Sequence, residues 1–171
     1  MKKLFNIFAA ALIALSFASC NKSNEPEVKE FIDLGLPSGT LWSNVNEKNP
    51  KDQLGFYLFD EAVSEFGAQL STKEQWQELL QICTFEKTKS GYKIIGRNGN
   101  SIFLPYAGYR DCDGASSTGD GFGCYWTSTA VGDYSPDNAY DITFRDDMDE
   151  PYFSAGPKCF GYSVRLIQLE K

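Results

Sequence analysis

The residues of this chain that could do chemistry are mainly carboxylates and aromatic side chains, because its 171 residues include no histidine. Without an imidazole the chain cannot build a Ser-His-Asp or Cys-His catalytic group or a His-ligated zinc site. Asp111 and Asp147 could form a pair for glycoside hydrolysis, which needs two carboxylates about 5 to 9.5 Å apart, but their spacing does not show that they meet. We therefore predict a protein that is not an enzyme, with a carbohydrate-processing enzyme as an alternative.

A long glycine-rich segment carries the best candidates for binding. Ala107 to Tyr125 contains five glycines and almost no aliphatic side chain, which predicts a long irregular loop. Long ordered loops commonly carry function, and flat aromatic rings beside polar groups suit sugars or protein epitopes. We predict that the ligand-binding residues are Tyr109, Arg110, Asp111 and Tyr134, and that the ligand is a glycan or a protein.

The charge of the chain bears on its partners. Sixteen basic and 23 acidic residues give a formal charge of -7 at pH 7. A chain of this kind lacks the basic surface that neutralises phosphates, so we expect no nucleic-acid partner. Aromatic residues make up 15% of the chain and hydrophobic residues 42%, which is typical of a packed globular domain.

The first twenty residues predict an export signal. Two lysines precede the apolar run Leu4 to Phe17, which as a helix would rise about 21 Å and so fall short of a hydrocarbon core of about 30 Å. Small residues then lead to Cys20, as in the lipobox of bacterial lipoproteins, although Phe17 stands where that pattern usually has an aliphatic residue. The alternative is an ordinary signal that leaves Cys20 as a spare thiol.

These features divide the chain into three parts. Residues 1–19 are predicted to be a lipoprotein signal peptide, residues 20–30 a lipidated Cys20 with a flexible tether, and residues 31–171 a single domain. The predicted partner of the N-terminus is the membrane, through the lipid anchor. The predicted location is the outer membrane, with the domain facing the periplasm or the cell surface.

Four further cysteines remain in the domain, namely Cys83, Cys112, Cys124 and Cys159. An even number in an oxidising compartment permits two disulfides in any of three pairings. The loop-rich stretch between Cys112 and Cys124 favours that pair, which leaves Cys83 and Cys159 as the second. The alternative is that the cysteines are free buried thiols.

Hydrophobic spacing predicts two short helices followed by strands. Phe59, Ala62, Val63 and Phe66 fall on one helical face that ends at Gly67, and a second helix begins at Ser71 or Thr72, with Trp76 as a core residue. Asn98 and Gly99 predict a hairpin turn. The predicted strands lie within residues 31–42, 92–95, 101–105, 125–128, 139–145 and 162–169.

Five ordered blocks of this sequence carry a family resemblance: Asp33–Trp42, Leu70–Trp76, Asn98–Gly108, Tyr125–Ser128 and Gly161–Arg165. Together they resemble the Fibrobacter succinogenes major paralogous domain, which is common in Bacteroidetes lipoproteins. The sequence departs from the family at residues 43–46, where the family usually continues through a cysteine-bearing segment.

The same order of elements is similar to the C-type lectin-like fold, which includes the formylglycine-generating enzymes. The resemblance implies an α+β domain with two short helices packed on small antiparallel sheets and long irregular loops gathered at one end. The generating enzymes require a close cysteine pair near the C-terminus, where this chain has only Cys159, so that activity is not expected.

A calcium site is a further possibility that the lectin resemblance suggests. The loop from Asp111 fails as an EF-hand, because Ala115 and Phe122 stand where oxygen ligands are needed. Sugar-binding C-type lectins hold calcium beside a proline flanked by amide and acid ligands. The corresponding candidates here are Asp137, Asn138, Asp146 and Asp147.

The chain is therefore interpreted as a cell-envelope lipoprotein that acts as a non-catalytic binding or adhesion module, without a cofactor unless calcium binds. A structural subunit of a surface assembly is the alternative from a different class.

Overall fold

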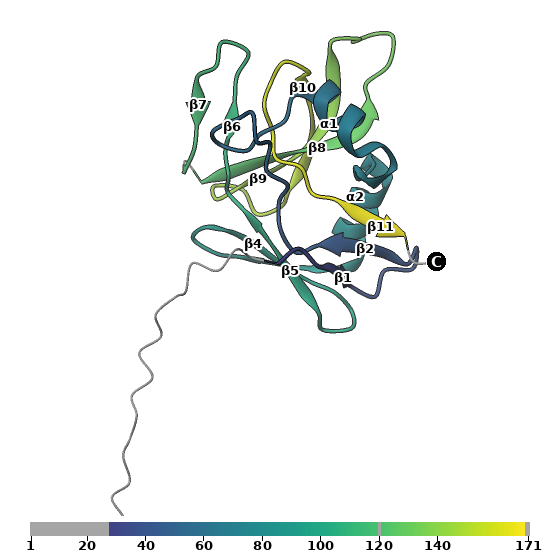
Figure 1. Cartoon of the computed structure of the whole chain (residues 1–171). Coiled ribbons are helices and arrows are strands. Elements are labelled where there is room, and N and C mark those ends of the chain that lie inside the picture. Colours follow the sequence, from purple (N-terminus) through teal and green to yellow (C-terminus); the bar gives the residue numbers. More distant parts are fainter. Residues whose placement is uncertain (1–27, 120, 170–171) are drawn as a thin grey trace, which may run out of the picture.

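The computed structural model describes residues 28–119 and 121–169 (Figure 1). The predicted signal peptide, Cys20 and most of the tether lie outside these residues. The described chain is a mixed α+β structure, as predicted, with two short helices and several small antiparallel sheets. No helix within the described part of the chain is long and apolar enough to cross a membrane.

The helices are α1 (Phe59–Phe66), a 3-10 turn (Gly67–Gln69) and α2 (Lys73–Ile82). The strands are β1 (Phe31–Asp33), β2 (Thr40–Ser43), β3 (Thr84–Lys87), β4 (Gly91–Ile95), β5 (Ser101–Pro105), β6 (Tyr109–Arg110), β7 (Ser116–Ser117), β8 (Phe122–Ala130), β9 (Asn138–Arg145), β10 (Tyr152–Pro157) and β11 (Ile167–Leu169). They form three three-stranded sheets, β1-β2-β11, β10-β9-β8 and β3-β4-β5, and the small hairpin β6-β7.

Local signals fix both helices. Gly67 ends α1 with a positive φ of 50°, a conformation that favours glycine. Thr72 is the N-cap of α2: its hydroxyl accepts the Gln75 N–H, and the Gln75 side chain accepts the Thr72 N–H. The structure thus decides for Thr72 over Ser71. Val63, predicted on the buried face of α1, is instead 38% exposed.

The core has two adjoining clusters of buried side chains. In the first, Trp76 lies 4.6 Å from Trp42 and 6.1 Å from Phe144 between ring centroids, which confirms it as a core residue. In the second, the ring centroids of Trp126 and Tyr162 lie 4.2 Å apart. Aromatic rings of this size supply much of the apolar area that the domain buries.

The predicted hairpin around Asn98 and Gly99 is confirmed as the β4–β5 connection, in which Gly96 N–H donates to the Asn100 carbonyl. Analysis of the sequence did not predict four of the strands, β3, β6, β7 and β10. β3 is polar and mostly exposed, β10 ends in Gly156 and Pro157, and β6-β7 has only two residues on each side. Such segments lack the alternation of apolar and polar residues by which a strand is recognised in a sequence.

The predicted disulfide between Cys112 and Cys124 is wrong, and so is the second pair. Cys112 is bonded to Cys159, while Cys83 and Cys124 are free. The reason is that Arg110 and Gly161 exchange both backbone hydrogen bonds, which brings the hairpin against the chain before Gly161. Cys124 instead points into the second core cluster.

Candidate functional site

The hairpin residues predicted to bind a ligand are engaged within the fold. Tyr109 is half-buried and stacks on Phe160 at 5.6 Å between ring centroids. The Arg110 Nε lies 2.8 Å from Asp52 Oδ2. Burial raises the pKa of Asp52, but hydrogen bonds from Leu54, Phe56 and Arg110 outweigh it and hold the pKa below its ordinary value.

Asp111 and Tyr134 differ in their surroundings. The Asp111 carboxylate accepts the backbone N–H groups of Asp113 and Ala115, which shapes the turn of the hairpin. Tyr134 is 79% exposed, with its hydroxyl 3.3 Å from that of Tyr140. The structure therefore brings Tyr109, Arg110 and Asp111 together, and places Tyr134 in the separate β8–β9 loop (Figure 1).

The four calcium candidates are not brought together. Asp137 and Asn138 lie at the start of β9, whereas Asp146 and Asp147 follow its end. An eight-residue strand is about 24 Å long, so one ion cannot reach both pairs. Asp147 is also held by two 2.7 Å bonds from the Arg145 guanidinium. Within residues 28–119 and 121–169, no three His, Cys, Asp or Glu side chains are grouped to hold a metal.

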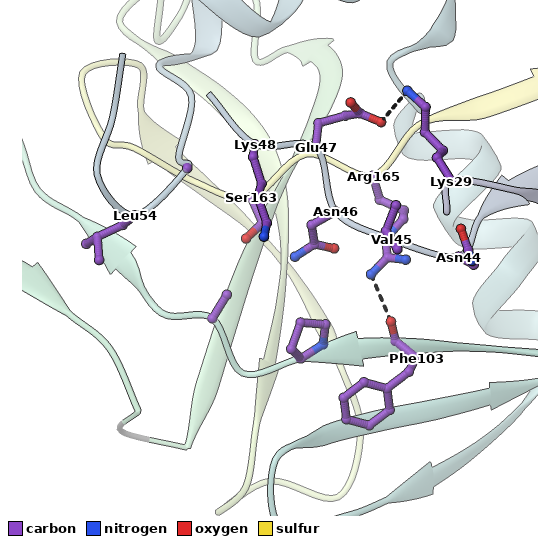
Figure 2. Close-up of a pocket in the computed structure, with 13 residues that line it drawn as sticks. Lys29, Asn44, Val45, Asn46, Glu47, Lys48, Leu54, Phe103, Ser163 and Arg165 are labelled. Carbon is purple, nitrogen blue, oxygen red and sulfur yellow. Dashed lines mark hydrogen bonds and ion pairs between the residues drawn. The ribbon is translucent and has the colours of Figure 1, made fainter. Parts of the chain in front are cut away.

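A sizeable cavity lies elsewhere, beside the point where the described chain begins. We call it the tether pocket; its volume is about 770 Å³. It is lined by Lys29, residues 44–48, Leu54, Gly55, Phe103, Pro105, Ala107, Ser163 and Arg165. Figure 2 shows Leu54 on one side and Phe103 on the other, with Asn46 between them and Glu47 and Lys48 above.

Arg165 joins the walls of this pocket. Its side chain is 1% exposed, and its guanidinium donates to the Ser43 carbonyl at 2.9 Å and to the Phe103 carbonyl at 2.8 Å. Arg165 thus has a structural role, because its planar fork joins a carbonyl of β2 to a carbonyl of β5. The bond to Phe103 is drawn in Figure 2.

The floor of the pocket is polar. Asn46 Nδ2 donates to the Tyr125 hydroxyl at 3.3 Å, and that hydroxyl donates to the Pro105 carbonyl at 2.9 Å. Burial raises the pKa of Tyr125, so the phenol stays protonated at neutral pH. The Asn46 Oδ1 is buried and finds no hydrogen-bond partner among the residues that the structure describes.

The last part of the tether forms one edge of the pocket. The Asn44 side chain accepts the Glu30 N–H at 2.8 Å and donates to the Val28 carbonyl at 3.1 Å. Lys29 Nζ lies 2.8 Å from Glu47 Oε1 (Figure 2). The chain therefore enters the domain along the edge of the pocket. An attachment of the residues before Val28 to a surface would keep the pocket close to that surface.

Analysis of the sequence missed the pocket, although one signal for it was present. The β5 strand buries Ile102 and Leu104 but leaves Phe103 38% exposed. An aromatic residue in the outward phase of a strand faces away from the core, and here it lines the pocket. Asn46 and Lys48 carry no comparable signal, because their loop has no regular pattern.

Two ionisable side chains, those of Asp141 and Cys124, are buried in the β8–β9–β10 sheet. Asp141 is 1% exposed; its carboxylate accepts the Thr143 hydroxyl at 2.9 Å and the Gly156 N–H at 3.0 Å. Burial raises the pKa of Asp141 to about 6 and that of the nearby Cys124 to about 12. A thiol with such a pKa is a poor nucleophile, which fits a packing role for Cys124.

Replacing Asp141 with asparagine is expected to flatten the pH dependence of stability. The pKa of Asp141 is raised in the fold from 3.8 to about 6, so the stability from its protonated form is complete below pH 3.8 and is lost as the pH rises through 6. The loss in the wild type should approach about 3 kcal/mol.

Urea denaturation between about pH 4 and pH 7 would measure this effect, with Asp133→Asn in the exposed β8–β9 loop as the control. A pH profile of Asp141→Asn parallel to that of the wild type would contradict the assignment.

Comparison with known proteins gives no match: no family model fits the chain, no curated protein is similar to it, and no solved structure matches its fold. The resemblance to the paralogous domain therefore depends on the five sequence blocks alone.

Proposed function

We propose that the chain is a non-catalytic binding module of the cell envelope and that it holds a glycan in the tether pocket. The observation that carries the proposal is the lining of this pocket. A half-exposed Phe103 and the aliphatic Leu54 stand around a floor with the amide of Asn46, whose buried oxygen has no partner in the described chain. Sugars combine apolar C–H faces with hydroxyl groups, and a pocket of this volume suits a few rings.

The tether pocket is a better candidate than the predicted hairpin site. At the hairpin site, the side chains of Tyr109, Arg110 and Asp111 already make contacts within the domain. In the tether pocket, by contrast, Phe103 and Leu54 expose 38% and 46% of their surface. Exposed side chains around a concavity can meet a ligand without unfolding any part of the chain.

The proposed architecture is C-type lectin-like. In its favour, the β6-β7 hairpin and the β8–β9 loop both lie at the upper end of the molecule in Figure 1, and residues 157–161 contact each of them. Arg110 bonds Gly161 through the backbone, and Lys158 N–H donates to the Asp137 carbonyl. Irregular segments gathered at one end are what the resemblance implies.

The binding proposal is tested by applying the full-length protein, solubilised in detergent, to a glycan array. We expect binding that Phe103→Ala abolishes and that Tyr134→Ala leaves intact. Tyr134 is the matched control, because it is an exposed aromatic residue outside the pocket. Both substitutions should leave stability within about 1 kcal/mol.

The opposite pattern, in which Tyr134→Ala alone loses glycan binding, would assign the binding site to the β8–β9 loop. If no glycan is bound, a structural subunit of a surface assembly becomes the better proposal.

The proposed location is the outer membrane, through a lipid on Cys20, which lies outside the described residues. Metabolic labelling with a fatty-acid analogue should mark the wild type and fail to mark Cys20→Ala. Equal labelling of the two proteins would exclude this anchor.

A further inference from the structure

We propose that the glycan held in the tether pocket is anionic, that is, a saccharide bearing a phosphate, sulfate or carboxylate group. This inference rests on the proposed function and adds the class of ligand to it. It follows from the charge of the pocket, the surroundings of Lys48, the aromatic wall and the place of the pocket next to the tether.

The charge of the pocket is opposite to that of the chain. Three of the lining residues are cationic and one is acidic, whereas the chain has 16 basic and 23 acidic residues. The one acid, Glu47, is bound to Lys29 at 2.8 Å and so presents little free negative charge to a ligand. A concave surface with this balance attracts anions and repels cations.

Lys48 is the residue placed to meet the anion. It is exposed and lines the pocket, and among the residues that the structure describes it has neither an ion pair nor a hydrogen bond. Lys29, by comparison, is already paired with Glu47. An ammonium group free to turn its three N–H donors toward a phosphate or carboxylate makes short, strong hydrogen bonds.

Phe103 gives the saccharide its second contact. Its ring stands on the outward face of β5, and its backbone carbonyl is fixed by Arg165 at 2.8 Å. Figure 2 shows this ring below the pocket, with Glu47 and Lys48 above. A sugar lying between them would place a C–H face on the ring and an anionic substituent at the lysine.

The position of the pocket makes two sources of this ligand accessible. Val28 lies eight positions after Cys20 in the sequence, and a fully extended chain of that length reaches at most about 28 Å. With Cys20 anchored, the pocket would lie within that reach of the bilayer surface. The anionic saccharide could therefore be the headgroup of a membrane glycolipid or part of a free acidic polysaccharide.

The test compares a neutral oligosaccharide with its uronate and phosphorylated forms, titrated into the full-length protein in detergent. We expect the anionic forms to bind at least about tenfold more tightly, with an advantage that shrinks as salt is added. Lys48→Glu should remove this preference and leave the weak binding of the neutral form. Lys89→Glu is the matched control, because Lys89 is exposed and lies outside the lining.

Each result separates the two proposals. Equal binding of neutral and anionic forms, or a preference that survives in Lys48→Glu, overturns the inference while the binding function stands. Absence of binding to any of the saccharides overturns both.

Vesicles of neutral phospholipid with and without a phosphorylated glycolipid then distinguish the sources. Binding that requires the glycolipid and resists competition by the free saccharide assigns the headgroup, whereas full competition assigns the polysaccharide.

Discussion

Replacing Arg165 with alanine is expected to lower the free energy of unfolding by about 4 kcal/mol. The guanidinium joins the end of β2, at the Ser43 carbonyl, to the middle of β5, at the Phe103 carbonyl. Alanine leaves these two carbonyls without their donor in the interior and opens a cavity where the side chain stood, since Arg165 is 1% exposed.

Arg165→Lys is the informative partner of that variant. Lysine keeps the charge and most of the aliphatic stem, but its single ammonium cannot reproduce a fork that spans two strands. Urea denaturation should therefore place it between the wild type and Arg165→Ala. Equal stability of all three proteins would show that the fork does not join the two sheets.

Loss of the disulfide is the second large effect that we expect. Cys112 and Cys159 are 47 residues apart in sequence, and opening a loop of that length costs about 4 kcal/mol in the chain-entropy description. The double variant Cys112→Ser with Cys159→Ser should lose this stability. The wild type should lose the same amount when reductant is added, because both cysteines are exposed.

The control for this experiment is Cys83→Ser, which removes a free thiol. The stability of Cys83→Ser should fall when reductant is added, as that of the wild type does. The stability of the double variant should not change on adding reductant. A reductant response that persists in the double variant would contradict the assigned pairing.

The parts of the fold that could be predicted from the sequence are those with local causes. The cap of α2 needs only Thr72 and Gln75, three residues apart, and the β4–β5 turn needs only Asn98 and Gly99. Trp76 was recognisable as a core residue because its helix repeats apolar residues on one face. These features depend on neighbours within one or two turns of chain.

The disulfide and the tether pocket could not be predicted, because they depend on contacts between distant segments. Cys112 meets Cys159 through the pairing of Arg110 with Gly161, which no local pattern announces. The pocket likewise joins five stretches of chain, among them those around Asn46, Phe103 and Ser163. The hydrophobic pattern of a stretch predicts which of its own side chains are buried. It does not predict which other stretch they will pack against.

The pairing of residues 162–167 bears on the order of folding. Tyr162, Ser163, Val164 and Leu166 form single bridges to Tyr57, Tyr125, Glu47 and Leu70, respectively. Ile167 then pairs with Trp42 in the sheet of β2. Closing such long loops is slow, and none of these bridges can form before residues 162–167 have been made.

During synthesis, the earlier strands must therefore remain with part of their apolar surface uncovered until residues 162–167 have been added. A chaperone that delays collapse until residue 167 has emerged would help this domain more than one that assists each hairpin in turn.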